Sequence, residues 1–227
     1  MRQAVVIGAS GGIGAALAEA LRQGGAFDEI VGLSRRSSPP LDLCEEASIA
    51  QAAEQVARRG MPCLVFDATG LLSDGTLQPE KSLPSLDPAA MARSFAVNAI
   101  GPALLMKHFL PRLPRNGRAV FVTLSAKVGS IGDNRLGGWY SHRAAKAALN
   151  QLVRTAAIEL ARTHREAMCV AMHPGTVDTP LSRPFSKAGL EAIAPSTAAR
   201  DLLTGLARLG PADSGGFFDR HGQPIPF

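Results

Sequence analysis

The sequence predicts a doubly wound α/β fold, with helices on both faces of a parallel sheet of about seven strands. Two observations predict it. Runs that are apolar throughout, such as QAVVIG and GRAVFVTLS, alternate with helical segments, and such runs indicate strands buried on both faces. A glycine-rich turn also joins the first strand to the first helix. The 227 residues, 46% of them hydrophobic, suit a single domain over residues 1–227.

The elements follow in order along the chain. We expect short apolar strands, the last of them a possible one, at QAVVIG (3–8), EIVGLS (29–34), LDL (41–43), PCLVFDATG (62–70), GRAVFVTLS (117–125), AMCVAMHPG (167–175) and GGFFD (215–219). Between them we expect helices over 13–22, 45–59, 88–110, 140–162 and 195–209. Residues 176–195 are rich in Pro, Ser and Gly, which predicts either a substrate-covering loop or an inert connection.

Composition excludes several functional classes. The net charge is +5, but the arginines are scattered among acids with almost no aromatic neighbours, so we expect a solvated surface and no nucleic-acid partner. Three cysteines without CxxC spacing indicate a reducing compartment. We see no leader sequence and no apolar run near the ~20 residues that span a bilayer, which favours a cytoplasmic protein without a membrane partner. The histidines lack metal-ligand spacing, so we predict no metal site.

The turn GASGGIG contains the candidate phosphate-binding residues. Gly8 permits a tight turn, Gly12 allows the backbone to approach a pyrophosphate, and Gly14 allows close packing of helix and strand. Ser10 and Ile13 lie in the same turn and are expected to contact the same ligand. The following helix presents its N-terminus to the phosphates. A purely structural glycine turn is the alternative, and a P-loop is excluded because no Gly-Lys-Ser/Thr follows.

The second strand ends in LSRR instead of an acidic residue. An acidic side chain there would hold the ribose 2′-hydroxyl of NAD and repel a 2′-phosphate. Ser34 is able to hydrogen-bond a phosphate, and Arg35 or Arg36 to pair with it and stack on adenine. We therefore expect NADP(H) in preference to NAD(H), with ordinary surface arginines as the alternative.

The Gly-x-x-x-Gly-x-Gly spacing resembles that of the short-chain dehydrogenase/reductase family, and the resemblance extends over nearly the whole chain. The segments SAKVGSIGDNRLGGWYSHRAAKAALN and SGGFFDRHGQPIPF resemble its C-factor-like subgroup. The resemblance implies a single-domain Rossmann fold. It further implies that Asp42 contacts the adenine amino group, that Ala68, Thr69 and Gly70 lie beside the adenine ribose, and that Pro174, Gly175, Val177 and Thr179 meet the nicotinamide. Asp67 stands where the family has Asn.

The family's active site has a Tyr and a Lys four residues apart, a Ser and an Asn. Lys146 matches the lysine that holds the nicotinamide ribose, and Asn98 matches the asparagine that holds a helix-bound water. The tyrosine position is His142.

The serine position is ambiguous. Alignment on Gly129 puts the family's serine at Ala126, one residue after Ser125, with Ser130 as a weaker substitute. Tyr140 is predicted to lie about 120° from the face of the helix that carries Lys146.

These residues leave two functions open. The first is an oxidoreductase that passes hydride between nicotinamide and a small-molecule carbonyl or secondary alcohol, with His142 as an atypical acid/base or with Tyr140 or a water in its place. The second is an NADP(H)-binding signalling or sensing protein with little turnover. The alanine-rich helix from Ala144 to Ala161 favours a homodimer or homotetramer, although burial within the monomer explains the same alanines.

Overall fold

A computed structural model describes residues 1–74, 77–185 and 192–227 of the chain. Within these residues, one sheet of six parallel strands runs in the order β2-β1-β3-β4-β5-β6. The strands are β1 (Arg2–Ile7), β2 (Glu29–Leu33), β3 (Met61–Asp67), β4 (Ala119–Leu124), β5 (Ala167–His173) and β6 (Phe217–Asp219). The predicted doubly wound parallel sheet is confirmed.

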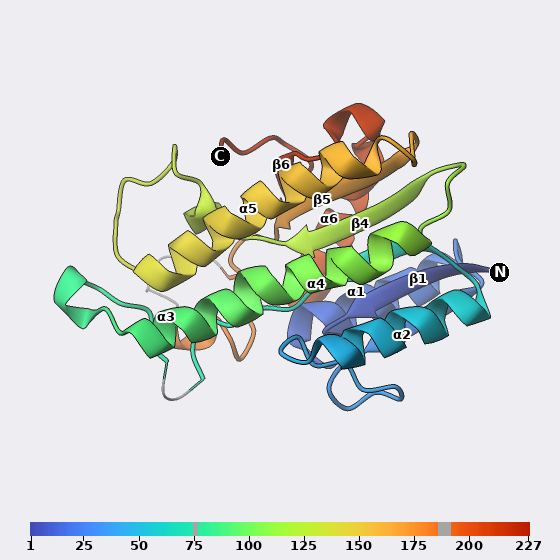
Figure 1. The fold of residues 1–227 in the computed structure, drawn as a ribbon. Helices are drawn as coiled ribbons and strands as arrows, with labels where there is room; N and C mark the ends of the chain where they lie inside the picture. Colours follow the sequence, from blue (N-terminus) through green and yellow to red (C-terminus); the bar gives the residue numbers. More distant parts are fainter. Residues whose placement is uncertain (75–76, 186–191) are drawn as a thin grey trace.

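Helices cover both faces of this sheet. They are α1 (Gly12–Gly24), α2 (Glu46–Arg59), α3 (Pro88–Phe95), α4 (Gly101–Phe109), α5 (Tyr140–Leu160) and α6 (Pro195–Arg208), with short 3₁₀ turns at Leu83–Ser85, Leu110–Arg112, Lys127–Gly129, Arg183–Phe185 and Pro211–Asp213. Figure 1 shows α2, α4 and α5 across one face and α1 and α6 behind the other.

The two faces have separate cores. Ile49 of α2, Leu105 of α4 and Leu149 of α5 belong to one buried cluster, and Leu17 of α1 and Leu202 of α6 to the other. Alternate residues of the strands contribute to the two clusters, as with Val5 and Val6 of β1. Because both faces are covered, β1, β3, β4 and β5 are buried over most of their length and contain continuous apolar runs, which is why such runs predicted them. The edge strand β2 is only partly buried.

Two segments differ from the prediction. Residues 41–43 form no strand: Asp42 Oδ1 accepts a hydrogen bond from the Cys44 amide at 2.9 Å, and this side-chain turn leads into α2. The expected helix over 88–110 is divided by a π-helical turn, Ala96–Ile100, between α3 and α4. Such turns occur often at functional sites, and this one contains Asn98.

The helical stretch Pro88–Arg112 is long and apolar enough to span a bilayer, with a mean hydropathy of 1.3 in its most apolar part. We had expected no such stretch. Its residues Leu105 and Phe109 are fully buried in the core shared with α2 and α5. A core helix of this kind passes the same composition test, so the stretch is weak evidence for a membrane span.

The carboxyl ends of the central strands bring the predicted site together. Gly8 follows β1 and donates to Leu33 O at 2.8 Å, Ala68 follows β3 and donates to Ile7 O at 2.9 Å, and Ser125 follows β4 and donates to Met172 O at 2.8 Å. These bonds hold the chain segments after β1, β3 and β4 at one edge of the sheet. Ligands bind at this edge in open α/β sheets.

Candidate active site at the carboxyl edge of the sheet

The glycine turn after β1 is shaped by close backbone contacts. Gly8 has φ +82°, and the Gly11 amide donates to Gly8 O at 2.9 Å. A Cβ on Gly14 would lie 2.2 Å from Gly8 O, and a Cβ on Gly12 would lie 2.9 Å from Thr179 Cγ2. The first turn of α1 has no side-chain cap. The amide groups of this first turn therefore lie at a helix N-terminus beside the pocket, which fits a pyrophosphate.

Two neighbouring pockets open at this edge, of about 670 and 330 Å³. They share the residues between them, Ser10, Gly11 and the segment 68–71. The larger pocket is lined by most of the predicted site residues: Ser10, Gly12, Ile13, Ala68, Thr69, Gly70, Asn98, Ser125, His142, Lys146, Pro174, Gly175, Val177 and Thr179. Gly8, Ser34, Arg35 and Asp42 line the smaller pocket, together with residues of the shared segment.

Two predicted residues line neither pocket. Gly14 is buried and packs against Gly8, in agreement with a packing role. Arg36 is exposed, and its amide donates to Ser34 Oγ at 3.2 Å. Of the two arginines that follow β2, Arg35 is therefore the one that borders the smaller pocket.

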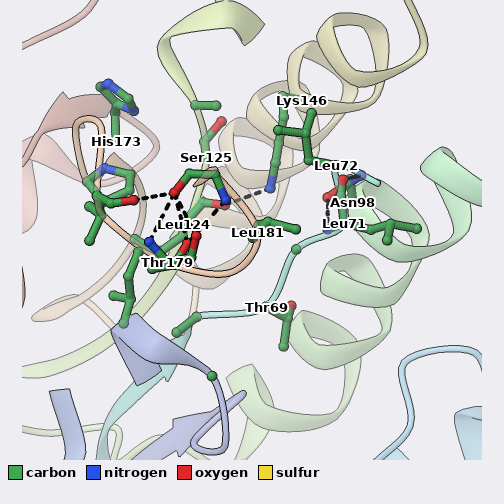
Figure 2. Close-up of a pocket in the computed structure, with 18 of the residues that line it drawn as sticks. Thr69, Leu71, Leu72, Asn98, Leu124, Ser125, Lys146, His173, Thr179 and Leu181 are labelled. Carbon is green, nitrogen blue, oxygen red and sulfur yellow. Dashed lines mark hydrogen bonds between the residues drawn. The ribbon is translucent and has the colours of Figure 1, made fainter. Parts of the chain in front are cut away.

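Lys146 is buried at the inner end of the larger pocket, with 4% of its surface exposed. Its Nζ donates to Leu124 O at 2.8 Å, as Figure 2 shows. Burial lowers the pKa of this ammonium to about 8, and the nearby Asp67 opposes the change. Lys146 thus joins α5 to the end of β4 and places a donor beside the pocket.

His142 lies one helical turn before Lys146 and lines the same pocket. Burial lowers the pKa of its imidazole to about 3, aided by the charge of Lys146 and opposed by a hydrogen bond to the Leu71 backbone. Within the described part of the chain its Nδ1 is buried without a hydrogen-bond partner. The ring is therefore neutral at physiological pH.

Ser125 lines the pocket, but its hydroxyl is engaged elsewhere. Its Oγ donates to Asn150 Oδ1 at 2.7 Å, and both residues are buried. Asn150 continues the row of His142 and Lys146 at intervals of four residues on α5. The sequence reasoning missed it, although this spacing was a usable signal.

Asn98 is fully buried in the π-helical turn and fastens the chain after β3. Its Oδ1 accepts from the Leu71 amide at 3.0 Å, and its Nδ2 donates to Leu71 O at 2.7 Å (Figure 2) and to Ser94 Oγ at 3.3 Å. Both ends of the amide therefore hold the Leu71 backbone beside the pocket.

Asp67, at the end of β3, is also fully buried. Its Oδ1 accepts from the Thr69 amide at 3.0 Å and from Thr69 Oγ1 at 2.5 Å, and its Oδ2 accepts from Thr123 Oγ1 at 2.7 Å. Burial raises the pKa of this carboxyl, while these bonds and Lys146 oppose the rise. Asp67 thereby orients Thr69, which lines both pockets.

Glu80 anchors the N-terminus of α5, a role the sequence did not indicate. Its buried carboxylate accepts from the Ser141 amide at 3.1 Å and from Ser141 Oγ, and its carbonyl accepts from the Trp139 amide at 2.5 Å. A negative charge at a helix N-terminus is stabilising. Trp139, at φ +53°, lines the pocket, and Tyr140 does not line it.

The remaining features of the site concern metal-ligating groups, the cysteines, His173 and the loop after β5. Within residues 1–74, 77–185 and 192–227 no group of three metal-ligating side chains occurs, and the cysteines are free. His173 lines the pocket, and burial lowers its pKa to about 4. Of the expected loop 176–195, residues 186–191 lie outside the described residues; Val177 pairs with Ile193 across them.

Comparisons with known proteins place these features in context. The family model described as enoyl-(acyl carrier protein) reductase matches residues 8–205. The chain is 32% identical over 225 residues to cis-4-hydroxycyclohexanecarboxylate dehydrogenase of Sinomonas cyclohexanicum, covering 91% of this chain and 84% of the relative. It is 33% identical over 147 residues to the C-signal of Myxococcus xanthus, covering 64% and 84%.

Among solved structures, the fold is similar to that of the NADPH-bound carbonyl reductase from chicken fatty liver. The TM-score is 0.87 at 23% identity, with 100% of this chain and 94% of the other covered. At this level of identity the likeness supports the fold alone.

The Asn98→Asp substitution tests whether the hydrogen bonds from the Asn98 amide to the Leu71 backbone stabilise the fold. A carboxylate keeps the acceptor for the Leu71 amide but loses both donated bonds, so we expect a loss of about 1–3 kcal/mol in unfolding free energy, measured by urea denaturation. Asn134→Asp is the control: Asn134 is exposed, and its Oδ1 accepts from the Gly137 amide. Equal urea midpoints for the Asn98→Asp variant and the native protein would contradict the stabilising role of the Asn98 amide.

The state of His142 is testable by its imidazole ¹⁵N resonances. A model imidazole titrates near pH ~6.5, whereas His142 is expected to stay neutral from pH 8 to 5, because its folded pKa is about 3. In this range the unfolded chain binds more protons at this site. His142 therefore makes the fold less stable as pH falls from ~6.5 toward 3. A transition of the His142 signals between pH 5 and 8 contradicts its neutral burial.

Proposed function

Because the chain belongs to the short-chain dehydrogenase/reductase family, we propose that it is an NADP(H)-dependent oxidoreductase acting on a small-molecule carbonyl or secondary alcohol. The observation that carries the proposal is the glycine turn at the start of α1, continuous with a pocket containing Lys146. The solved neighbour from chicken liver, whose fold this chain shares, is described as NADPH-bound, and the extension of that cofactor to this chain is part of the proposal.

The residues that would hold the dinucleotide follow from the two pockets. The amides of Gly12 and Ile13 would bind the pyrophosphate, with Ser10 between the two halves. In the smaller pocket, Ser34 and Arg35 would meet a 2′-phosphate and Asp42 the adenine, beside Gly8. Ala68, Thr69 and Gly70 would line the adenosine ribose. In the larger pocket Pro174, Gly175, Val177 and Thr179 would border the nicotinamide.

When bound, the nicotinamide supplies or accepts the hydride. We propose that Lys146 holds the ribose hydroxyls, since its Nζ has two protons beyond the one donated to Leu124 O. Ser125 positions the substrate oxygen after its hydroxyl turns from Asn150, and Asn98 keeps Leu71 in place at the pocket wall. His142 is a weak acid/base here, because burial and the Lys146 charge keep its imidazole neutral. Turnover is therefore expected to be slow.

The second candidate is an NADP(H)-binding signalling or sensing protein with little or no turnover. The buried, neutral state of His142 favours it, since the site would then contain an imidazole in place of the family's phenol. The two candidates share cofactor binding and differ only in whether a proton reaches the substrate.

We also keep a homodimer or homotetramer as a proposal. Large apolar side chains are exposed on α5, at Leu152 and Ile158, and at Ile100 before α4. Burial of such residues between copies of the chain would stabilise an assembly.

Cofactor choice is tested with Arg35→Asp. Removal of a charge-assisted hydrogen bond, worth about 1.5–3 kcal/mol, is expected to weaken NADPH binding by about 10–150-fold and to leave NADH binding unchanged or improved, measured by calorimetry. The matched variant is Arg36→Asp, which we expect to have the smaller effect because Arg36 borders neither pocket. Equal losses in both variants would show that neither guanidinium is specific for the phosphate.

The role of position 142 is tested with His142→Tyr. A phenol four residues before Lys146 restores the family's proton donor, so we expect NADPH consumption against a carbonyl panel to rise by about 100-fold or more. Tyr140→Phe in the same background is the control, since Tyr140 lies outside the pocket. Activity in both native and variant proteins supports the enzyme, and activity in the variant alone supports the second candidate. An inactive variant that still binds NADPH contradicts this assignment of position 142.

A further inference from the structure

An aromatic wall lines the larger pocket at the start of α5. The Trp139 ring lies edge-on to the His142 ring, with centroids 6.2 Å apart at 75°, and edge-on to the Phe185 ring, at 5.6 Å and 72°. All three residues line the pocket. Trp139 therefore joins the helix that carries Lys146 to the segment after β5, and the two aromatic rings border one space with the neutral imidazole.

The remaining walls on this side are also apolar. Leu71 and Leu72 after β3, Val128 after β4 and Leu181 after β5 line the same pocket. No carboxylate occurs among its described lining residues, so a cationic ligand would lose hydration without an ionic partner.

The pocket also offers little to an anion. Lys146 is buried and donates to Leu124 O, and Lys127 is paired with Asp133 at 3.5 Å. Burial lowers the pKa values of His142 and His173 to about 3 and 4, so neither ring adds positive charge near neutral pH. In the proposed function the remaining protons of Lys146 go to the ribose, so a substrate carboxylate would find no unengaged counter-charge among the described lining residues.

From this geometry we propose that the substrate is an uncharged carbonyl compound, or the matching alcohol, with its reacting carbon attached to an aromatic or alicyclic ring. The proposal rests on the function given above. The ring packs against Trp139 and Phe185, and the oxygen faces Ser125 and Lys146. Aromatic side chains favour edge-to-face and offset contacts with a second ring. A rigid ring also loses less conformational freedom on binding than a flexible chain of similar size.

The sequence contains one tryptophan, so the indole N–H of Trp139 gives a single resonance in a ¹⁵N-correlated spectrum. The protein is saturated with NADP⁺, which cannot reduce a ketone, and binding is followed without turnover. The probes are acetophenone, 4-acetylbenzoate (the same ring with a carboxylate) and 2-octanone. We expect acetophenone to shift the indole signal and to bind at least about tenfold more tightly than either other probe.

Variants then test the aromatic contact. Phe185→Ala is expected to weaken acetophenone binding by about tenfold and to leave NADP⁺ binding unchanged. Leu136→Ala is the control, since Leu136 is 92% exposed, and it should bind acetophenone as the native protein does. Unchanged acetophenone binding in Phe185→Ala would overturn the aromatic contact.

The outcomes separate this inference from the proposed function. If NADP⁺ shifts the amides of Gly11 and Gly12 but no probe shifts the indole, the substrate class is wrong and the cofactor proposal stands. Equal or tighter binding of 4-acetylbenzoate overturns the uncharged class, and equal binding of 2-octanone overturns the ring. If NADP⁺ itself leaves the glycine amides unchanged, the proposed function fails as well.

Discussion

The electrostatics of the site depend on one buried ammonium group. Lys146 reaches from α5 to the carbonyl at the end of β4 and lies among apolar strands, where an isolated charge is costly. Asp67, buried at the end of the adjacent strand β3, is the nearest source of opposite charge, and each group moves the pKa of the other toward ionisation. Burial, aided by the same positive charge, keeps His142 unprotonated. One lysine thus influences the protonation of a carboxyl and an imidazole at two neighbouring elements.

In the proposed function, this arrangement affects how a proton reaches the substrate. A lysine beside a phenol lowers the pKa of the phenol toward neutrality, which makes the phenol a better donor and acceptor. At His142, burial and the Lys146 charge together lower the pKa of the imidazole to about 3, well below that of a free imidazole. On the proposed assignment of His142 to the family's tyrosine position, the lysine that would assist a phenol therefore opposes protonation of the imidazole.

Much of the fold was predictable because both faces of the sheet are covered. Burial on two sides requires continuous apolar runs, and these marked all six strands of the described sheet. The same reasoning failed at 41–43, where two leucines flank an aspartate: both leucines are buried as in a strand, but the Asp42 side chain bonds the Cys44 amide and turns the chain. Apolar residues in a sequence indicate that a segment is buried. A run of only three residues does not indicate whether that buried segment is a strand or a turn.

The site was predictable where backbone conformation requires a residue type, as in the glycine turn, and where a spacing of four residues places side chains in a row. Contacts between segments that are distant in sequence produce no comparable pattern of residue type or spacing. Glu80 is far from Ser141 in sequence and lies in a stretch without periodicity, and the π-helical turn at Asn98 depends on its bonds to Leu71. Side-chain partners of this kind are set by the packing of the whole molecule.

The contact between Glu80 and the start of α5 has a consequence for how this protein can diversify. Leu71 and Leu72 line the pocket after β3, and Glu80, further along the same connection to α3, holds Ser141 one residue before His142. In the proposed function, a change in this part of the chain would also move the start of α5, where His142 lies. Substrate selectivity and proton transfer would then change together, and a redesign of one would have to adjust the other.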